Sequence, residues 1–207
     1  MTSDTRVGDR PGDVIGHDIT AAATMGQLRN ILRAQLLERS EPPSDVVGRL
    51  DRAIRVLRIH TMATLNLVNV QPPRPDDPDH VAVLRWSNAG HPAPILIDAD
   101  GTAVLLTESS DLMLGVEPGT TRRDHTHRVP PGATLLLYTD GLVETRTDAI
   151  DAGQQRLLDA ASNHHQLDLG DLLDAVLADM VGDRPSDDVA VLAVRFPAAA
   201  QPDARPT

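Results

Sequence analysis

Apolar residues recur every three or four positions in two segments near the start of the chain. This spacing is typical of the buried face of an amphipathic helix. The first stripe consists of Ala21, Met25, Leu28, Leu32 and Leu36. Asp18 is a suitable N-cap for this helix, and Pro42 and Pro43 mark its end. Ser44 is predicted to cap a second helix, whose stripe consists of Val47, Leu50, Ile54 and Leu57.

The middle of the chain has alternating and continuous apolar patterns, which predict strands. Residues 62–70 alternate, with Leu65 and Leu67 on one face. Residues 133–138 form a continuous apolar run that suits a strand buried on both faces. Asp100-Gly101 is a hairpin signal. The other strands predicted in this part of the chain cover residues 81–86, 94–97 and 102–106, and residues 87–92 are predicted to form a turn.

The last third of the chain returns to the helical period and then ends in another apolar run. Residues 150–161 and 169–180 are predicted helices, and residues 189–196 are a predicted buried strand. Helices, a series of antiparallel strands, further helices and a final strand are typical of the α+β class. The sequence shows no internal repeat and no second domain.

Amino-acid composition and net charge indicate which classes of protein and of partner are expected. The 207 residues are 41% hydrophobic and 24% charged, which predicts one soluble globular domain. A net charge of −11 argues against nucleic-acid binding and against anionic membranes as partners. The absence of cysteine excludes a disulfide framework. Because no apolar run of about 18 residues and no apolar leader is present, a cytoplasmic location is expected.

Carboxylates stand where predicted strands meet tight turns. Asp13 follows Gly12, Asp140 follows the run at 133–138, and Asp187 with Asp188 precedes the final strand. Carboxylates gathered at one rim of a sheet repel one another unless a cation joins them. An all-oxygen ligand set favours Mg²⁺ or Mn²⁺. Turn formation and protection of a sheet edge are the alternative interpretation of the same residues.

Four segments carry a resemblance to a known family. They are GDVIGHDITAAATMGQLRN at 12–30, SNAGHPAPILI at 87–97, LLLYTDGLVE at 135–144 and SDDVAVLAVR at 186–195. In this order the chain resembles the metal-dependent (PPM, type 2C-like) protein serine/threonine phosphatases, in the bacterial branch that includes SpoIIE and RsbU. The resemblance runs from about Gly12 to Phe196.

The resemblance implies a fold, a cofactor and a set of ligands. The fold would be a four-layer α-β-β-α sandwich of two mostly antiparallel sheets, with two Mn²⁺ or Mg²⁺ ions at one end. The metal ligands would be the carboxylates of Asp13, Asp140 and Asp187 and the carbonyl of Val14. A metal-bound water, rather than a side chain, would attack phosphorus.

The implied activity is hydrolysis of phosphoserine or phosphothreonine on a signalling protein. By resemblance, the substrate would be a phosphorylated anti-sigma-factor antagonist in a bacterial partner-switching pathway. The second hypothesis is a catalytically impaired phosphatase-like domain that acts as a protein-interaction module.

The chain departs from the family pattern at its N-terminus. Relatives begin upstream with a strand that carries a GGDWYD-like motif and a further metal ligand, so an N-terminally truncated sandwich is expected. Residues 1–11 are predicted to be irregular or disordered, 12–196 to form the domain and 197–207 to form a disordered tail. The segment TRVGDRP is too polar and proline-rich to be expected as the strand that carries Asp13. An exposed sheet edge would favour a homodimer.

Three histidines and two arginines are expected to have structural roles or to be solvated. His91 lies between two predicted strands, where a role in a turn or in packing is expected. His164 and His165 are expected to be solvated in a loop between helices. Arg122 and Arg123 are expected to form a solvated charge pair, with contact to a phosphate or an acidic partner as the alternative.

Overall fold

Two antiparallel sheets form the centre of the computed structural model, which describes residues 12–14, 19–74, 76–117, 119–144, 150–181 and 188–198. The first sheet has the order β1 (Gly12–Val14), β2 (Ala63–Gln71), β3 (Ala82–Ala89), β6 (His125–Val129). The second has the order β5 (Ala103–Leu105), β4 (Ile95–Ile97), β7 (Thr134–Tyr138), β8 (Val191–Arg195).

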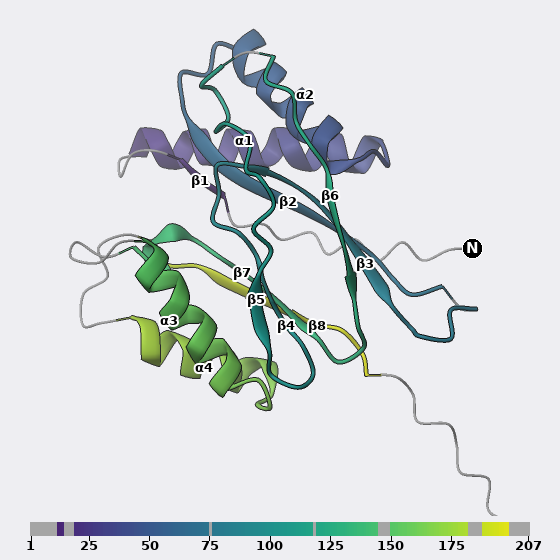
Figure 1. Ribbon diagram of the computed structural model, residues 1–207. Coiled ribbons are helices and arrows are strands. Elements are labelled where there is room, and N and C mark those ends of the chain that lie inside the picture. The colour runs from purple at the N-terminus through teal and green to yellow at the C-terminus, as the bar shows by residue number, and fades with distance from the viewer. Residues whose placement is uncertain are drawn as a thin grey trace, which may run out of the picture.

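Helix pairs cover the outer face of each sheet (Figure 1). The pair against the first sheet is α1 (Ile19–Glu38) and α2 (Pro43–Val56). The pair against the second sheet is α3 (Ile150–Asn163) and α4 (Leu169–Met180). This arrangement is the predicted α-β-β-α sandwich, so the predicted fold class is confirmed. None of the helices within the described ranges is long and apolar enough to cross a membrane.

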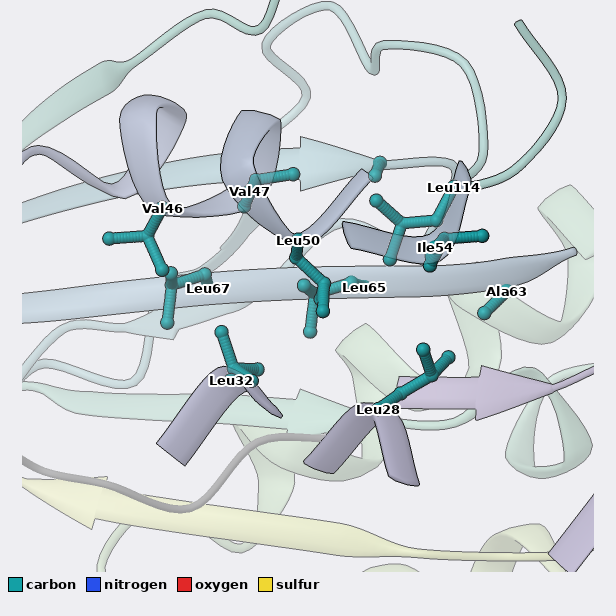
Figure 2. Close-up of a cluster of buried hydrophobic side chains, with 11 residues drawn as sticks. Leu28, Leu32, Val46, Val47, Leu50, Ile54, Ala63, Leu65, Leu67 and Leu114 are labelled. Carbon is teal, nitrogen blue, oxygen red and sulfur yellow. The ribbon is translucent and has the colours of Figure 1, made fainter. Parts of the chain in front are cut away.

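Three separate apolar clusters fill the spaces between the four layers. In the first, Leu65 and Leu67 of β2 lie between α1 and α2 (Figure 2). The second lies between the inner sheet faces and contains Trp86 of β3 and Leu135 of β7. The third lies between the second sheet and α3 and α4. Each cluster buries apolar surface at about 25 cal/mol per Å², which holds the layers together.

Strand β7 contributes to two of these clusters. Leu135 and Leu137 point into the space between the sheets, whereas Leu136 and Tyr138 point toward α3 and α4. All five residues of the strand are buried. Because side chains alternate between the two faces of a strand, a strand covered on both faces needs a continuous apolar run, as the sequence predicted.

Strand β1 is the strand that carries Asp13. Its three residues pair with β2, with Asp13 opposite Thr64 and Val14 opposite Ala63. The segment TRVGDRP lies outside the described residues, and the strand that carries Asp13 is formed by Gly12–Val14. Pairing with β2 stabilises the extended conformation, which glycine and aspartate do not favour by themselves.

The N-terminus of α2 is capped differently from the prediction. Ser44 lies inside the helix, and its backbone N–H and hydroxyl both donate to the carboxylate of Asp124, at 2.9 and 2.8 Å. Arg85 donates to the same carboxylate at 2.8 Å. An anion at a helix N-terminus satisfies free N–H groups and interacts favourably with the helix dipole. The cap comes from a residue 80 positions away, which helix periodicity cannot reveal.

Three smaller expectations also change. Strand β3 continues to Ala89, into the segment predicted to be a turn. Strand β8 is half-buried rather than fully buried. His164 and His165 are half-buried and bonded to Asp179 and to the carbonyl of Ser162. The predictions for Asp18, for residues 1–11 and for most of the C-terminal tail lie outside the described residues.

Glycine in α3 allows this helix to lie against the turn that follows β7. A Cβ added at Gly153 would overlap the carbonyl oxygen of Val143. Gly153→Ala is therefore expected to destabilise the fold by about 1–3 kcal/mol, although alanine favours helices. Urea unfolding checks this. The matched control is Gly170→Ala in α4, where the added methyl group meets open space. That change should be neutral or stabilising, and equal effects at both positions would contradict the packing argument.

Candidate metal centre

The space between the sheets changes from apolar to polar toward one end of the molecule. On β2, Val68 and Val70 pack in the inter-sheet cluster. The same face of this strand continues with Asn66 and Thr64, because alternate residues share a face. Thr64 is the residue opposite Asp13 of β1. The polar end of the sandwich therefore coincides with the strand that carries a predicted metal ligand.

Strand β3 shows the same change. Leu84 and Trp86 are buried in the inter-sheet cluster, and Asn88 follows them on the same face. Asn88 lies opposite Asn66 of β2, and both side chains are buried. Neither polar atom of the Asn66 side chain has a hydrogen-bond partner in the described part of the chain. Buried polar side chains in such a position are typical of a site that binds water, an ion or a ligand.

His91 connects the two sheets at this end. Its Nδ1 lies 2.9 Å from the hydroxyl of Thr64 on β2, and its Nε2 lies 3.0 Å from the carbonyl oxygen of Tyr138 on β7. A carbonyl oxygen can only accept, so Nε2 carries the proton and donates to it. Nδ1 of the neutral ring then accepts from the Thr64 hydroxyl. The expectation of a packing role is thus refined to a specific link between strands.

The protonation state of His91 follows from its burial. His91 is only 5% exposed, and this burial lowers the pKa of His91 to about 4. The hydrogen bond to the Tyr138 carbonyl acts in the opposite direction and raises this pKa. The neutral imidazole is therefore the form present near neutral pH.

This depressed pKa predicts how stability depends on pH. Between pH 6.5 and about 4 the unfolded chain binds a proton at this histidine, whereas the folded chain does not. The stability that His91 contributes is thus lost as pH falls through this range, by about 3 kcal/mol in total. Urea unfolding of the metal-free protein measures it. The free energy of unfolding of His91→Gln should fall less steeply with decreasing pH than that of the wild type, and parallel curves for the two proteins would contradict the prediction.

Asp140 begins a short 3₁₀ turn (Asp140–Leu142) directly after β7. Its backbone carbonyl accepts hydrogen bonds from Val143 and Glu144, which fix the turn. One carboxylate oxygen, Oδ1, accepts the N–H of Gly141 at 2.9 Å. The other, Oδ2, has no hydrogen bond with any residue that the structure describes, and the residue is half-buried. A carboxylate that is held on one side and open on the other can coordinate a cation.

Thr139 connects the segment before Asp140 with the segment after Asp187. The Thr139 hydroxyl donates to the carbonyl of Asp188 at 3.0 Å and accepts the N–H of Ala190 at 2.9 Å. The Thr139 N–H donates to the carbonyl of Ala190 at 3.0 Å. The residue before Asp140 is therefore bonded to the residue after Asp187, although Asp187 itself lies outside the described residues.

The four predicted ligands are placed as follows. Asp13 and Val14 lie on β1, where the structure describes the backbone. Asp140 follows β7. Asp187 lies outside the described ranges. Among the described residues no group of three or more acidic or histidine side chains could by itself hold a metal. The ligand set therefore stays a prediction, and its all-oxygen chemistry fits a hard divalent ion.

The contact between His91 and Thr64 was not predicted from the sequence. The partners of the His91 ring are 27 and 47 residues away in the sequence. The available signal was local: Asn88 accepts the N–H of His91 and donates to its carbonyl, both at 2.8 Å, which builds the turn in SNAGHPAP. That turn fixes the ring in the space between the sheets.

Comparisons with known proteins agree on one fold. The family model described as Stage II sporulation protein E (SpoIIE) matches residues 3–197. The RsbU and RsbW domains of Rv1364c from Mycobacterium tuberculosis are similar, with a TM-score of 0.72 and 25% identity over 92% of this chain and 53% of that one. The chain thus spans about half the length of that protein.

Two further solved structures have the same fold. The SiaA-PP2C domain of Pseudomonas aeruginosa has a TM-score of 0.70 and 22% identity, covering 89% of this chain and 74% of that one. The PPM Ser-Thr phosphatase MsPP from Mycobacterium smegmatis, in complex with cacodylate, has a TM-score of 0.62 and 15% identity, covering 94% and 91%.

Proposed function

Because the chain belongs to the SpoIIE family, whose fold is that of PP2C-type protein serine/threonine phosphatases, we propose that it hydrolyses phosphoserine or phosphothreonine on a protein. The reaction would depend on Mn²⁺ or Mg²⁺, with two ions expected. The observation that carries this proposal is the polar end of the sandwich. There His91 links β2, the strand paired with the one that bears Asp13, to β7, the strand that precedes the turn at Asp140.

The residues at the polar end of the sandwich would bind the metal ions and orient their ligands. Asp13, Asp140 and Asp187 supply carboxylates, and Val14 supplies its carbonyl oxygen. When bound, the metal ions would lower the pKa of a coordinated water toward 7 and neutralise charge on the phosphoryl group. The hydrogen bond from Gly141 fixes the orientation of the Asp140 carboxylate, so that Oδ2 is available. No side-chain nucleophile is required.

The substrate proposed is a phosphorylated signalling protein of the anti-sigma-factor antagonist type. One similar structure contains RsbU and RsbW domains, and another belongs to the bacterial stressosome, both of which are regulatory systems. The cytoplasmic location predicted from the sequence is part of the same proposal. A protein substrate also agrees with a net charge of −11, which disfavours nucleic acid as a partner.

Phosphate release from a phosphoserine peptide tests the proposal. The full chain should release phosphate with millimolar Mn²⁺ or Mg²⁺, stop when EDTA is added and recover when metal is restored. Circular dichroism in each condition shows that the chain remains folded. A folded chain that binds Mn²⁺ without turnover would favour the interaction module instead. Turnover that persists in EDTA would contradict the metal-dependent mechanism.

A further inference from the structure

The two strands that lead to the proposed ligands belong to different sheets. Asp13 lies on β1 of the first sheet, and Asp140 follows β7 of the second. The ladder of backbone hydrogen bonds that fixes strand spacing within each sheet does not join β2 to β7. A metal ion shared by both sheets requires this separation to be held within a few tenths of an ångström, so side chains must set it.

His91 spans the gap at this point. Its ring bonds Thr64, the residue opposite Asp13, and the carbonyl of Tyr138, two residues before Asp140. We propose that His91 is a positioning residue, which sets the distance between β2, the partner of the strand that carries Asp13, and β7, which precedes Asp140, and thereby the geometry of the metal centre. This inference rests on the proposed function.

The ring is itself held rigidly. The side-chain amide of Asn88 bonds both the N–H and the carbonyl of His91, at 2.8 Å each. The hydroxyl of Ser110 donates to Asn88 Oδ1 at 3.2 Å. Since both ring nitrogens and both backbone polar groups of His91 participate, the imidazole has one orientation available. A side chain with a fixed length and a fixed orientation can act as a spacer.

The proposal distinguishes positioning from ordinary core packing. A buried histidine that only packs contributes to the free energy of unfolding, and the folded protein binds metal equally well without its hydrogen bonds. A spacer also affects the folded protein, because loss of one of its bonds lets the two strands move apart. Substitution of a residue that holds a metal ligand in place through hydrogen bonds lowers metal affinity by about 10–100-fold.

Thr64 provides the sharpest variant, because its hydroxyl can be removed with little change of shape. Thr64→Val removes the hydrogen bond to His91 Nδ1, whereas Thr64→Ser retains a hydroxyl. The matched control is Thr134→Val, at the opposite end of β7, where a buried hydroxyl accepts a hydrogen bond from Arg195 at 2.9 Å. Both threonine-to-valine changes remove one hydrogen bond from a strand, but only the first touches the link between the sheets.

Three measurements are made on each full-length variant: Mn²⁺ affinity by calorimetry, urea unfolding without metal, and kcat and KM for a phosphoserine peptide over a Mn²⁺ titration. Thr64→Val should weaken Mn²⁺ binding by about 10–100-fold, and Thr64→Ser should bind within about threefold of the wild type. Thr134→Val should keep wild-type Mn²⁺ affinity, even if its urea unfolding midpoint falls by as much as that of Thr64→Val.

The possible outcomes separate the two claims. Wild-type Mn²⁺ affinity in Thr64→Val would overturn the positioning role, and so would an equal loss of affinity in Thr134→Val. Binding of Mn²⁺ by the wild type without phosphate release would overturn the proposed function alone, since the affinity comparison still holds. A wild-type chain that does not bind Mn²⁺ would overturn both.

Discussion

Asp140→Asn is expected to lower kcat/KM for Mn²⁺-dependent phosphate release by about 10²–10³-fold. The substitution removes a negative charge from the proposed centre, and a metal ion contributes several kcal/mol to stabilising charge in the transition state. Asparagine keeps the size of the side chain and one oxygen, so the 3₁₀ turn after β7 should be retained. Steady-state kinetics over a Mn²⁺ titration measures the effect.

The control for Asp140→Asn is Asp174→Asn, which makes the same change of charge at an exposed position on α4. Its kinetics should match those of the wild type. The account fails at this point if Asp140→Asn, shown to be folded by circular dichroism, turns over substrate at the wild-type rate. It also fails if both variants lose activity equally, because the effect would then reflect net charge.

Arg122→Met is expected to lower the free energy of unfolding by about 3–5 kcal/mol. Arg122 forms an ion pair with Asp51 of α2 at 2.8 Å, and the two side chains are only 2% and 6% exposed. Arg122 also donates to the carbonyl of Leu112, and Asp51 accepts the N–H of Gly115. Removal of the guanidinium leaves a buried carboxylate without its counter-charge, which is the costly case. Urea unfolding at neutral pH measures the loss.

The neighbouring arginine is the matched control for this stability prediction. The Arg123 side chain is 61% exposed and lies 3.9 Å from Asp111. Arg123→Met should cost less than about 1 kcal/mol, because the guanidinium is exposed and because the backbone N–H of residue 123 still donates to the buried carboxylate of Asp111, at 2.8 Å. The double variant Asp51→Leu with Arg122→Met should recover much of the lost stability, because no buried charge remains. Equal losses at the two arginines would contradict the burial argument.

The sequence predicted the layers well because their signals are local. The continuous apolar run that became β7 and the stripe of α4 each reflect the faces that an element buries. The alternation of Leu65 and Leu67 on β2 likewise corresponds to one buried face. The hairpin at Asp100-Gly101 formed between β4 and β5, with φ of +91° at Gly101, which glycine adopts without strain.

Long-range polar contacts could not be predicted in this way. Arg122 looked like half of a solvated pair, yet its partner Asp51 lies 71 residues away and buries it. The cap on α2 comes from Asp124 rather than from Ser44, for the same reason. For His91 the sequence predicted only the turn in which it lies. The hydrogen bonds of its ring could not be predicted, because they depend on how the two sheets stack.

The candidate centre was predicted to a different extent at each residue. The pattern of an aspartate after an apolar strand predicted Asp140 as a ligand; the structure places Asp140 after β7, with Oδ1 bonded to the N–H of Gly141, and its role as a ligand stays a prediction. For Asp13 the sequence showed no suitable preceding strand in TRVGDRP, and the structure places Asp13 within the three-residue strand β1. This strand is short and polar, and it is extended because β2 pairs with it, so only tertiary context reveals it.

Anomalous diffraction from crystals of the wild-type chain soaked in Mn²⁺ tests the central claim most directly. The account predicts manganese peaks at the polar end of the sandwich, within coordination distance (about 2 Å) of the carboxylates of Asp13 and Asp140. Both sheets would then contribute to one centre. Peaks confined to other surfaces, or a centre coordinated from one sheet alone, would contradict the account of a metal site held between the two sheets.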